Sequence, residues 1–183
     1  LNIVKVLIEF DYIKDNKPNE LGICASYFRC ENELFIVEAI QSGFLNELDP
    51  PELAALFCAL VSEEPRKDFF QTYITSKKFG EVLKKLYGVK RKVSKIQKKF
   101  NVDTNLLLNT HLSGIVEKWA SGAEWEDIIR LVPIDEGDIV RTLKRTIDIL
   151  RQVVHAPYVN PELSDKCKVA LESINREPVI EIM

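Results

Sequence analysis

The sequence predicts an all-α helical bundle, and three observations support this fold class. Apolar residues recur at spacings of three and four along most of the 183 residues. Hydrophobic residues make up 46% of the chain, which is enough for a core without disulfide or metal staples. Proline, glycine and N-capping residues stand between the periodic segments, where helices begin and end.

The N-terminal part contains three predicted helices and one turn-rich segment. Tyr12–Glu20 is short and polar, contains DNKPNE, and predicts a small hairpin or wing. The helices, inferred from apolar residues at helical spacing, are Leu1–Phe10, Leu21–Arg29 and Glu31–Gln41. The last of them is expected to end at Ser42-Gly43.

The middle of the chain contains the strongest helix start. Asp49-Pro50-Pro51-Glu52 combines an N-cap, proline in the first turn and an acid near the positive end of the helix dipole. The helix that follows extends to about Glu63, is almost entirely apolar and should be the central buried helix. Pro65–Ser76 then predicts a loop, whose aromatic residues Phe69, Phe70 and Tyr73 look exposed and are candidates for docking onto a larger protein.

A long helix is predicted from Lys78 to Phe100, because apolar residues recur there at alternating spacings of four and three. Those residues are Val82, Leu86, Val89, Val93, Ile96 and Phe100. Between Lys77 and Lys99 there are ten Lys or Arg residues and one acid, Glu81, although the net charge of the chain is only −3. We expect a solvated face here, with Lys90, Arg91, Lys95 and Lys98 as an alternative surface for non-specific phosphate contact.

Three further segments near the C-terminus predict helices. Asp103 or Thr104 is expected to cap a helix through Ser121, which includes His111 and ends at Gly122. The other two helices are Glu124–Leu131 and Pro161–Asn175. Trp119 and Trp125 bracket the turn between the first two helices. We expect them to pack helices together, with base stacking as the less favoured alternative.

The most informative segment is Asp135–Val154, a predicted helix with two different faces. Ile139, Val140, Leu143, Ile147, Leu150 and Val154 share one side, which must face a core. The other side holds Arg141, Lys144, Arg145, Asp148, Arg151 and Gln152. Arginine can pair with phosphates and stack on bases, whereas Asp148 lies one turn from two of the cations and could form ordinary surface ion pairs with them. The residues alone leave a polyanion-binding face and a solvated face equally open.

The residues argue against an enzyme and against a metal site in this chain. Neither a phosphate-binding glycine loop nor the motifs of zinc proteases and serine hydrolases occur. His111 and His155 have no evident catalytic or metal partner in the sequence. Four cysteines lack zinc-like spacing, so we expect buried thiols in a reducing, cytosol-like compartment. We therefore expect no catalytic residues and no metal.

Two further features concern the context of the chain. No apolar run approaches the length of a membrane span, and no signal peptide is recognisable, so we expect no membrane partner. The chain begins with Leu1 and its single methionine is Met183, which we interpret as a piece of a longer protein.

Several motifs follow one another along the chain: the Leu-Asp-Pro start at Leu48-Asp49-Pro50, then Trp119-Ala120 with Gly122-Ala123, then Glu136-Gly137 before an arginine-rich helix. Their order resembles the C-terminal (DSHCT) domain of superkiller-type DExH-box RNA helicases. The family's tryptophan-alanine-x-Gly-Ala segment is similar to Trp119, Ala120, Gly122 and Ala123, and its Glu-Gly start of an arginine-rich helix is similar to Glu136-Gly137. FLNELDPPELAALFCALVSEE resembles the family's Leu-Asp-Pro helix, and ELGICASYF the end of the preceding winged-helix module. WEDIIRLVPIDEGD and NREPV look closest to the cyanobacterial and plastid branch.

The resemblance implies a fold, a site and partners. It implies a winged-helix remnant over residues 1–30 and a C-terminal helical bundle over residues 31–183. It further implies that Asp135–Val154 is a ratchet helix, lining the channel for single-stranded RNA. Arg145 and Asp148 would then meet the bases, with Arg141 and Lys144 on the same face; Asp148 is shorter than the family's usual glutamate.

The catalytic parts would lie elsewhere in the parent protein. The resemblance implies that two RecA-like domains of the same parent chain bind ATP and Mg²⁺, so this part carries no cofactor of its own. We expect a monomer in the cytoplasm, or in the plastid stroma of a plant or alga. Two alternatives stay open: a helical protein–protein interaction module, and an accessory domain of a DNA helicase.

Overall fold

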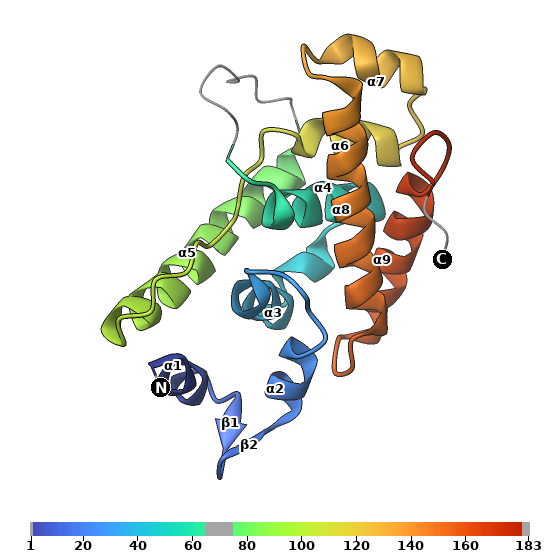
Figure 1. Ribbon diagram of the computed structural model, residues 1–183. Coiled ribbons are helices and arrows are strands. Elements are labelled where there is room, and N and C mark those ends of the chain that lie inside the picture. The colour runs from blue at the N-terminus through green and yellow to red at the C-terminus, as the bar shows by residue number, and fades with distance from the viewer. Residues whose placement is uncertain (1, 65–74, 181–183) are drawn as a thin grey trace.

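The computed structural model of the chain describes residues 2–64 and 75–180. Within these residues it is mostly helical, with one small two-stranded sheet, which confirms the predicted fold class. Helix α4 (Pro50–Val61) lies at the centre, and α8 (Glu136–His155) and α9 (Pro161–Ile174) run side by side across it (Figure 1). Helix α5 (Lys77–Lys99) extends away from α8.

The N-terminal part consists of helix α1 (Asn2–Glu9), strands β1 (Ile13–Lys14) and β2 (Lys17–Pro18), and helix α2 (Glu20–Ala25). The strands pair antiparallel, which confirms the predicted hairpin. Asp15 and Asn16 between them have φ angles of 51° and 59°, as a tight two-residue hairpin turn requires. Helix α2 ends well before Arg29, where the sequence placed its end. The domain boundary at residue 30 stays a prediction.

Helix α4 forms the centre of the core, as predicted. It follows α3 (Glu33–Gln41) and the short 3₁₀ helix η1 (Phe44–Glu47), and every residue from Glu52 to Leu60 is buried. It contacts α5, α6 (Ser113–Ala120), α8 and α9. The backbone N–H of Asp49 donates to Oε2 of Glu52 at 2.8 Å, so the predicted helix start closes as a capping box.

Helix α5 buries the predicted apolar side and keeps its cations outside. Phe79, Val82, Leu86, Val93 and Gln97 are buried, while Val89, Ile96 and Phe100 pack at the edge of the core. Most of the predicted loop Pro65–Ser76, with Phe69, Phe70 and Tyr73, lies outside the described residues.

The predicted helix from Asp103 to Ser121 is wrong in its first half. Residues 103–110 have no helical structure, and α6 begins only at Ser113. His111, expected within that helix, lies in the turn before α6. Thr104, expected as a helix cap, instead accepts a hydrogen bond from Nε2 of Gln97 at 2.5 Å.

The hydrogen bonds of this extended segment go to the end of α4 and to Asn32. Nδ2 of the buried Asn32 donates to the carbonyls of Leu60 and Leu107, both at 3.0 Å, and its Oδ1 accepts from the Leu107 N–H at 3.3 Å. The Asn109 N–H donates to the Ala59 carbonyl at 2.9 Å. Because distant groups satisfy the backbone, a helix here is unnecessary, and Leu106 and Leu108 are buried.

Two tryptophans join the C-terminal helices, as predicted. Trp119 of α6 is fully buried, and its ring lies 5.3 Å from that of Trp125, the first residue of α7 (Trp125–Leu131), in an edge-to-face arrangement. The Trp119 Nε1 donates to the Ile174 carbonyl at 3.0 Å. The guanidinium of Arg176 lies 3.3 Å from the centre of the Trp119 ring. The two tryptophans therefore bring α6, α7 and α9 together.

Candidate nucleic-acid interface

Helix α8 has the two faces that the sequence predicted, with a slightly rotated boundary. Its buried residues are Ile139, Leu143, Thr146, Ile147, Ile149, Leu150 and Val153, and this side packs against α4 and α9. Val140 and Val154, expected in the core, are only partly buried. Arg151 and Gln152, expected on the solvent side, are half-buried. The polar face is therefore centred on Arg141, Lys144, Arg145 and Asp148.

The start of α8 is fixed by its N-cap. Oδ1 of Asp135 accepts a hydrogen bond from the Gly137 N–H at 2.8 Å, as the sequence predicted for Asp135. One turn on, Nη1 of Arg141 lies 2.9 Å from Oδ1 of Asp138. The Arg29 N–H donates to Oε1 of Gln152 at 2.8 Å, which attaches the segment after α2 to the last turns of α8.

The four predicted site residues of α8 come together. Arg141, Lys144, Arg145 and Asp148 line one open, shallow hollow on the exposed side of the helix, together with Gly137 and Val140. All four are exposed. We call these four residues the α8 face. It presents three cations and one carboxylate to solvent on a backbone that the buried side of the helix holds in place.

Arg145 has a partner that the sequence did not indicate. Its Nη1 lies 3.0 Å from Oε1 of Glu63, in the segment that follows α4. The sequence placed the end of this helix near Glu63, but α4 ends at Val61. The side chains of Arg145 and Glu63 remain 48% and 74% exposed. Such an ion pair contributes less than about 1 kcal/mol in water, so an incoming anion can replace Glu63.

The ion pair between Arg145 and Glu63 stands between two further hollows. One, of about 380 Å³, is lined by His111, Pro133, Arg141 and Thr142 among others. The second, of about 440 Å³, is lined by residues that include Asn32, Asn105 and Asp148. Arg145 and Glu63 line both hollows. The surface beside the α8 face is therefore concave on both sides of Arg145.

No ion pair of the described residues joins Asp148 to Arg145, whose partner is Glu63. Oδ2 of Asp148 instead accepts a hydrogen bond from Nε2 of Gln152 at 2.8 Å. One oxygen of the carboxylate is thereby oriented along the helix, one turn from Arg145.

The second predicted basic surface lies on α5. Arg91, Lys95 and Lys98 are exposed there, but Lys90 is half-buried and lines a separate hollow with Ser94, Asp103 and Thr104. The structure therefore separates Lys90 from the other three residues of that prediction.

The thiols are poor candidates for chemistry. Cys24, Cys58 and Cys167 are buried, as expected, while Cys30 is partly exposed. Burial raises the pKa of Cys58 to about 11 and that of Cys167 to about 12. Both thiols are therefore protonated at neutral pH and are not nucleophiles. Across residues 2–64 and 75–180, no group of His, Cys, Asp and Glu side chains is arranged to hold a metal ion.

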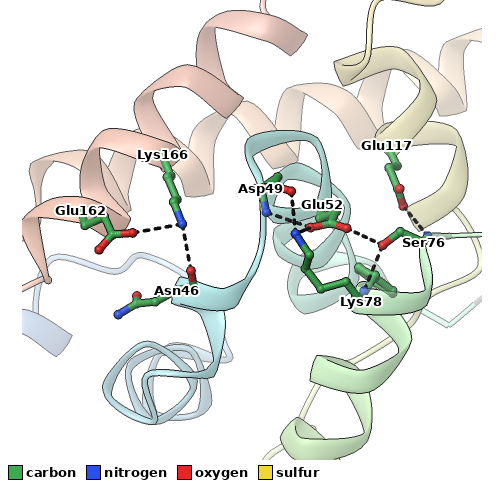
Figure 2. Close-up of polar contacts among 9 residues, drawn as sticks. Asn46, Asp49, Glu52, Ser76, Lys78, Glu117, Glu162 and Lys166 are labelled. Carbon is green, nitrogen blue, oxygen red and sulfur yellow. Dashed lines mark hydrogen bonds and ion pairs between the residues drawn. The ribbon is translucent and has the colours of Figure 1, made fainter.

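An acidic cluster joins the starts of α4 and α5 to α6. Figure 2 shows Glu52 between Ser76 and Lys78: the Ser76 Oγ donates to its Oε1 at 2.5 Å, and the Lys78 Nζ lies 3.6 Å from its Oε2. The Lys78 Nζ also lies 2.6 Å from Oδ2 of Asp49. The Ser76 N–H donates to Oε2 of Glu117 at 3.3 Å. Burial, and secondarily the charge of Glu52, raises the pKa of Glu117.

Replacing Glu117 by glutamine should stabilise the protein at neutral pH. A raised pKa means that the folded state binds the proton more tightly than the unfolded state, so stability from this group is lost as pH rises through the titration of the carboxyl. Glutamine at position 117 carries no charge, so this loss of stability at high pH disappears. Its amide oxygen can still accept the hydrogen bond from the Ser76 N–H. We expect a gain of about 0.5 kcal/mol at pH 7 that fades towards pH 4, measured by urea unfolding.

The matched control is Glu172→Gln, on the exposed side of α9, which should leave the pH dependence unchanged. A Glu117→Gln variant that is less stable than the wild type at pH 7 would show that the charged acceptor for Ser76 outweighs its burial.

No helix in the described part of the chain is long and apolar enough to cross a membrane.

Comparisons with known proteins agree on one family. Residues 15–181 match the family model of the DSHCT (NUC185) domain. The chain is 34% identical over 166 residues to the chloroplastic DExH-box ATP-dependent RNA helicase DExH15 of Arabidopsis thaliana, covering 88% of this chain and 14% of that protein. It is 28% identical over 153 residues to the ATP-dependent RNA helicase mtr4 of Schizosaccharomyces pombe, covering 80% of this chain and 14% of that one.

The human exosome RNA helicase MTR4 is similar at 26% identity over 165 residues, which is 86% of this chain and 16% of that protein. The chain thus spans about one seventh of the length of these relatives.

Proposed function

The chain belongs to the DSHCT (NUC185) domain family, and from this premise we propose that it is an accessory domain of an ATP-dependent RNA helicase. Its α8 acts as a ratchet helix that lines the channel for single-stranded RNA. Relatives in a plant, a fission yeast and human carry the name of RNA helicase, and the matched region is a small part of each.

The observation that carries this proposal is the composition of the α8 face. Three cations and one carboxylate line a single open hollow, and the opposite side of the same helix is fully packed. Cations on a rigid helix suit a phosphate backbone, and planar guanidinium groups can also stack on unpaired bases. Arg145 and Asp148 are the residues that we assign to base contact, while Arg141 and Lys144 contact the backbone.

The weakness of these contacts supports a moving strand. Among residues 2–64 and 75–180, the ion-pair partner of Arg145 is the exposed carboxylate of Glu63, so RNA exchanges one weak ion pair for another. A domain that held RNA tightly would resist the advance of the strand, whereas one wall of a channel needs only brief contacts.

The remaining parts of the activity belong to the parent protein in this proposal. Its RecA-like helicase core binds ATP and Mg²⁺ and packs against this domain, which acts as a monomer and holds no cofactor. A chloroplastic relative supports the plastid stroma as the compartment for a plant or algal parent, and the cytoplasm is proposed for others.

The proposal predicts that Arg141→Ala/Arg145→Ala weakens binding of single-stranded RNA by about tenfold at low salt. Each lost phosphate contact should also flatten the plot of log K against log salt by about 0.7, so the slope should change by about 1.4. Fluorescence anisotropy with a labelled oligonucleotide over a salt series measures both. Lys168→Ala, an exposed lysine on α9, is the matched control and should change neither.

Glu63→Gln should act in the opposite direction, because it removes the carboxylate that competes for Arg145. In the intact helicase, Arg145→Ala should slow the rate of unwinding, while the melting temperature of the domain should stay close to that of the wild type.

Binding that is unchanged in the double variant would reject the α8 face. Tighter binding to single-stranded DNA than to RNA would favour a DNA helicase, and capture of a protein partner that oligonucleotides do not displace would favour an interaction module.

A further inference from the structure

Eight of the ten cations of α5 fall into two series, each with a spacing of seven residues; Lys90 and Lys95 lie outside them. Lys78, Lys85, Lys92 and Lys99 form the first, and Lys77, Lys84, Arg91 and Lys98 form the second. Because seven residues are close to two helical turns, each series forms one line along the helix. The two lines have different surroundings, because only the first lies opposite acids of other elements.

Each lysine of the first series forms an ion pair with an acid of another element of the same chain. Lys78 pairs with Asp49 at 2.6 Å, Lys85 with Glu47 at 2.6 Å, Lys92 with Glu38 at 3.3 Å and Lys99 with Glu9 at 2.9 Å. These acids lie at the cap of α4, in η1, in α3 and in α1. The first series therefore links α5 to four other elements, and each of its lysines lies beside an acid of the fold.

The second series, together with Lys95, lies on the side of α5 opposite its buried residues. No ion pair links Lys84, Arg91, Lys95 or Lys98 to an acid of residues 2–64 or 75–180, and all four are exposed. Lys77 differs, because its Nζ lies 3.9 Å from Oε1 of Glu81. A surface that serves only solubility mixes both signs of charge, but this one carries a single sign from Lys84 to Lys98.

Tyr87 and Gly88 lie between Lys84 and Arg91 on the same helix. Tyr87 is 41% exposed, in the turn between Lys84 and Arg91. At Gly88 an added Cβ would meet only Nη2 of Arg91, at 4.0 Å, so the surface beside the ring is open. A ring between cations offers a stacking position for an unpaired base, which a purely electrostatic surface lacks.

We propose that Lys84, Tyr87, Arg91, Lys95 and Lys98 form a second binding surface for single-stranded RNA, the α5 stripe. Its cations contact phosphates over about 21 Å of helix, and Tyr87 stacks on a base. The surface lies on a different element from the α8 face and extends away from it (Figure 1). It would hold single-stranded RNA without regard to its sequence, because phosphate contacts and stacking do not read base edges. It rests on the proposed function only in taking RNA as the polyanion.

The test is a triple charge reversal, Lys84→Glu/Arg91→Glu/Lys95→Glu, in the 183-residue chain. We expect binding of a 20-nucleotide single-stranded RNA to weaken at least about tenfold at low salt, and the salt slope to flatten by about 2. The matched control, Lys5→Glu/Lys17→Glu/Lys168→Glu, gives the same net charge from exposed lysines on other elements. It should weaken binding less than about threefold, since only the long-range field changes.

Two further variants separate the parts of the stripe. Tyr87→Ala should weaken binding about fivefold without changing the salt slope, because stacking releases no counterions. Lys84→Gln/Arg91→Gln/Lys95→Gln removes the same three phosphate contacts but adds no acid. It should therefore give the same slope of log K against log salt as the charge reversal. Circular dichroism melting checks that each variant is folded.

The outcomes are distinct from those for the α8 face. Loss of binding in the triple reversal but not in Arg141→Ala/Arg145→Ala supports the stripe and rejects the α8 face. The reverse result rejects the stripe as a solvated surface. Equal losses in the triple reversal and its control also overturn the stripe, because net charge alone would then explain them. Displacement by an acidic peptide but not by RNA would overturn it in favour of a protein partner.

Discussion

Replacing Trp119 by alanine is expected to lower the free energy of unfolding by about 3–5 kcal/mol. The side chain is fully buried and donates a hydrogen bond to the Ile174 carbonyl, so alanine leaves both a cavity and an unpaired acceptor. It also removes the ring between Trp125 and the guanidinium of Arg176. Urea unfolding followed by circular dichroism measures the change.

The substitution should also weaken the turn between α6 and α7, in addition to leaving a cavity. Nη2 of Arg176 donates to the carbonyls of Trp119, at 2.9 Å, and Ala123, at 2.6 Å, so it closes the turn between α6 and α7. Without the ring beneath it, the guanidinium loses its stacking partner. Tyr27→Ala, at an aromatic residue that is 48% exposed, is the control and should cost about 0.5 kcal/mol or less. A loss below about 1 kcal/mol for Trp119→Ala would contradict the packing role.

Replacing Asn32 by leucine is expected to cost about 2–4 kcal/mol, although the side chains have similar size. Asn32 is 2% exposed, and its amide satisfies the Leu60 carbonyl and both backbone groups of Leu107. Leucine removes these hydrogen bonds and leaves the buried Leu60 carbonyl and the half-buried Leu107 backbone groups without this partner. The expected result is a lower urea midpoint with an unchanged m value, since the surface exposed on unfolding stays the same.

Asn105→Leu provides the comparison, because Asn105 lies on the same extended segment but is exposed. It should change stability by about 0.5 kcal/mol or less. Equal effects of the two substitutions would mean that the extended segment is not held by Asn32.

The helices and the α8 face could be predicted because their signals are local. The capping residues of α4 and the apolar period of α8 act within about four residues, which is the range that sequence spacing reports. The cations of α8 follow from the same period, since the buried side fixes the side that faces solvent. For the same reason Arg141, Lys144, Arg145 and Asp148 line one hollow as expected.

The parts that sequence reasoning missed depend on partners far away in the chain. Glu63 lies 82 positions from Arg145, and Asn32 lies 75 from Leu107. Residues 103–110 contain three leucines that fit a helix locally, but distant hydrogen bonds and burial outweigh that local preference. The two series on α5 are visible in the sequence as a seven-residue period, but only the structure tells which series has acids opposite it.

The four lysine ion pairs also make α5 a connection between distant parts of the fold. A helix of 23 residues is about 35 Å long, and its bridges run from the cap of α4 at one end to α1 at the other. Its ion pairs therefore connect the N-terminal helix α1 with the start of the central helix through one continuous element. The central helix also packs against α8, so α5 joins α1 to the helix that supports the α8 face.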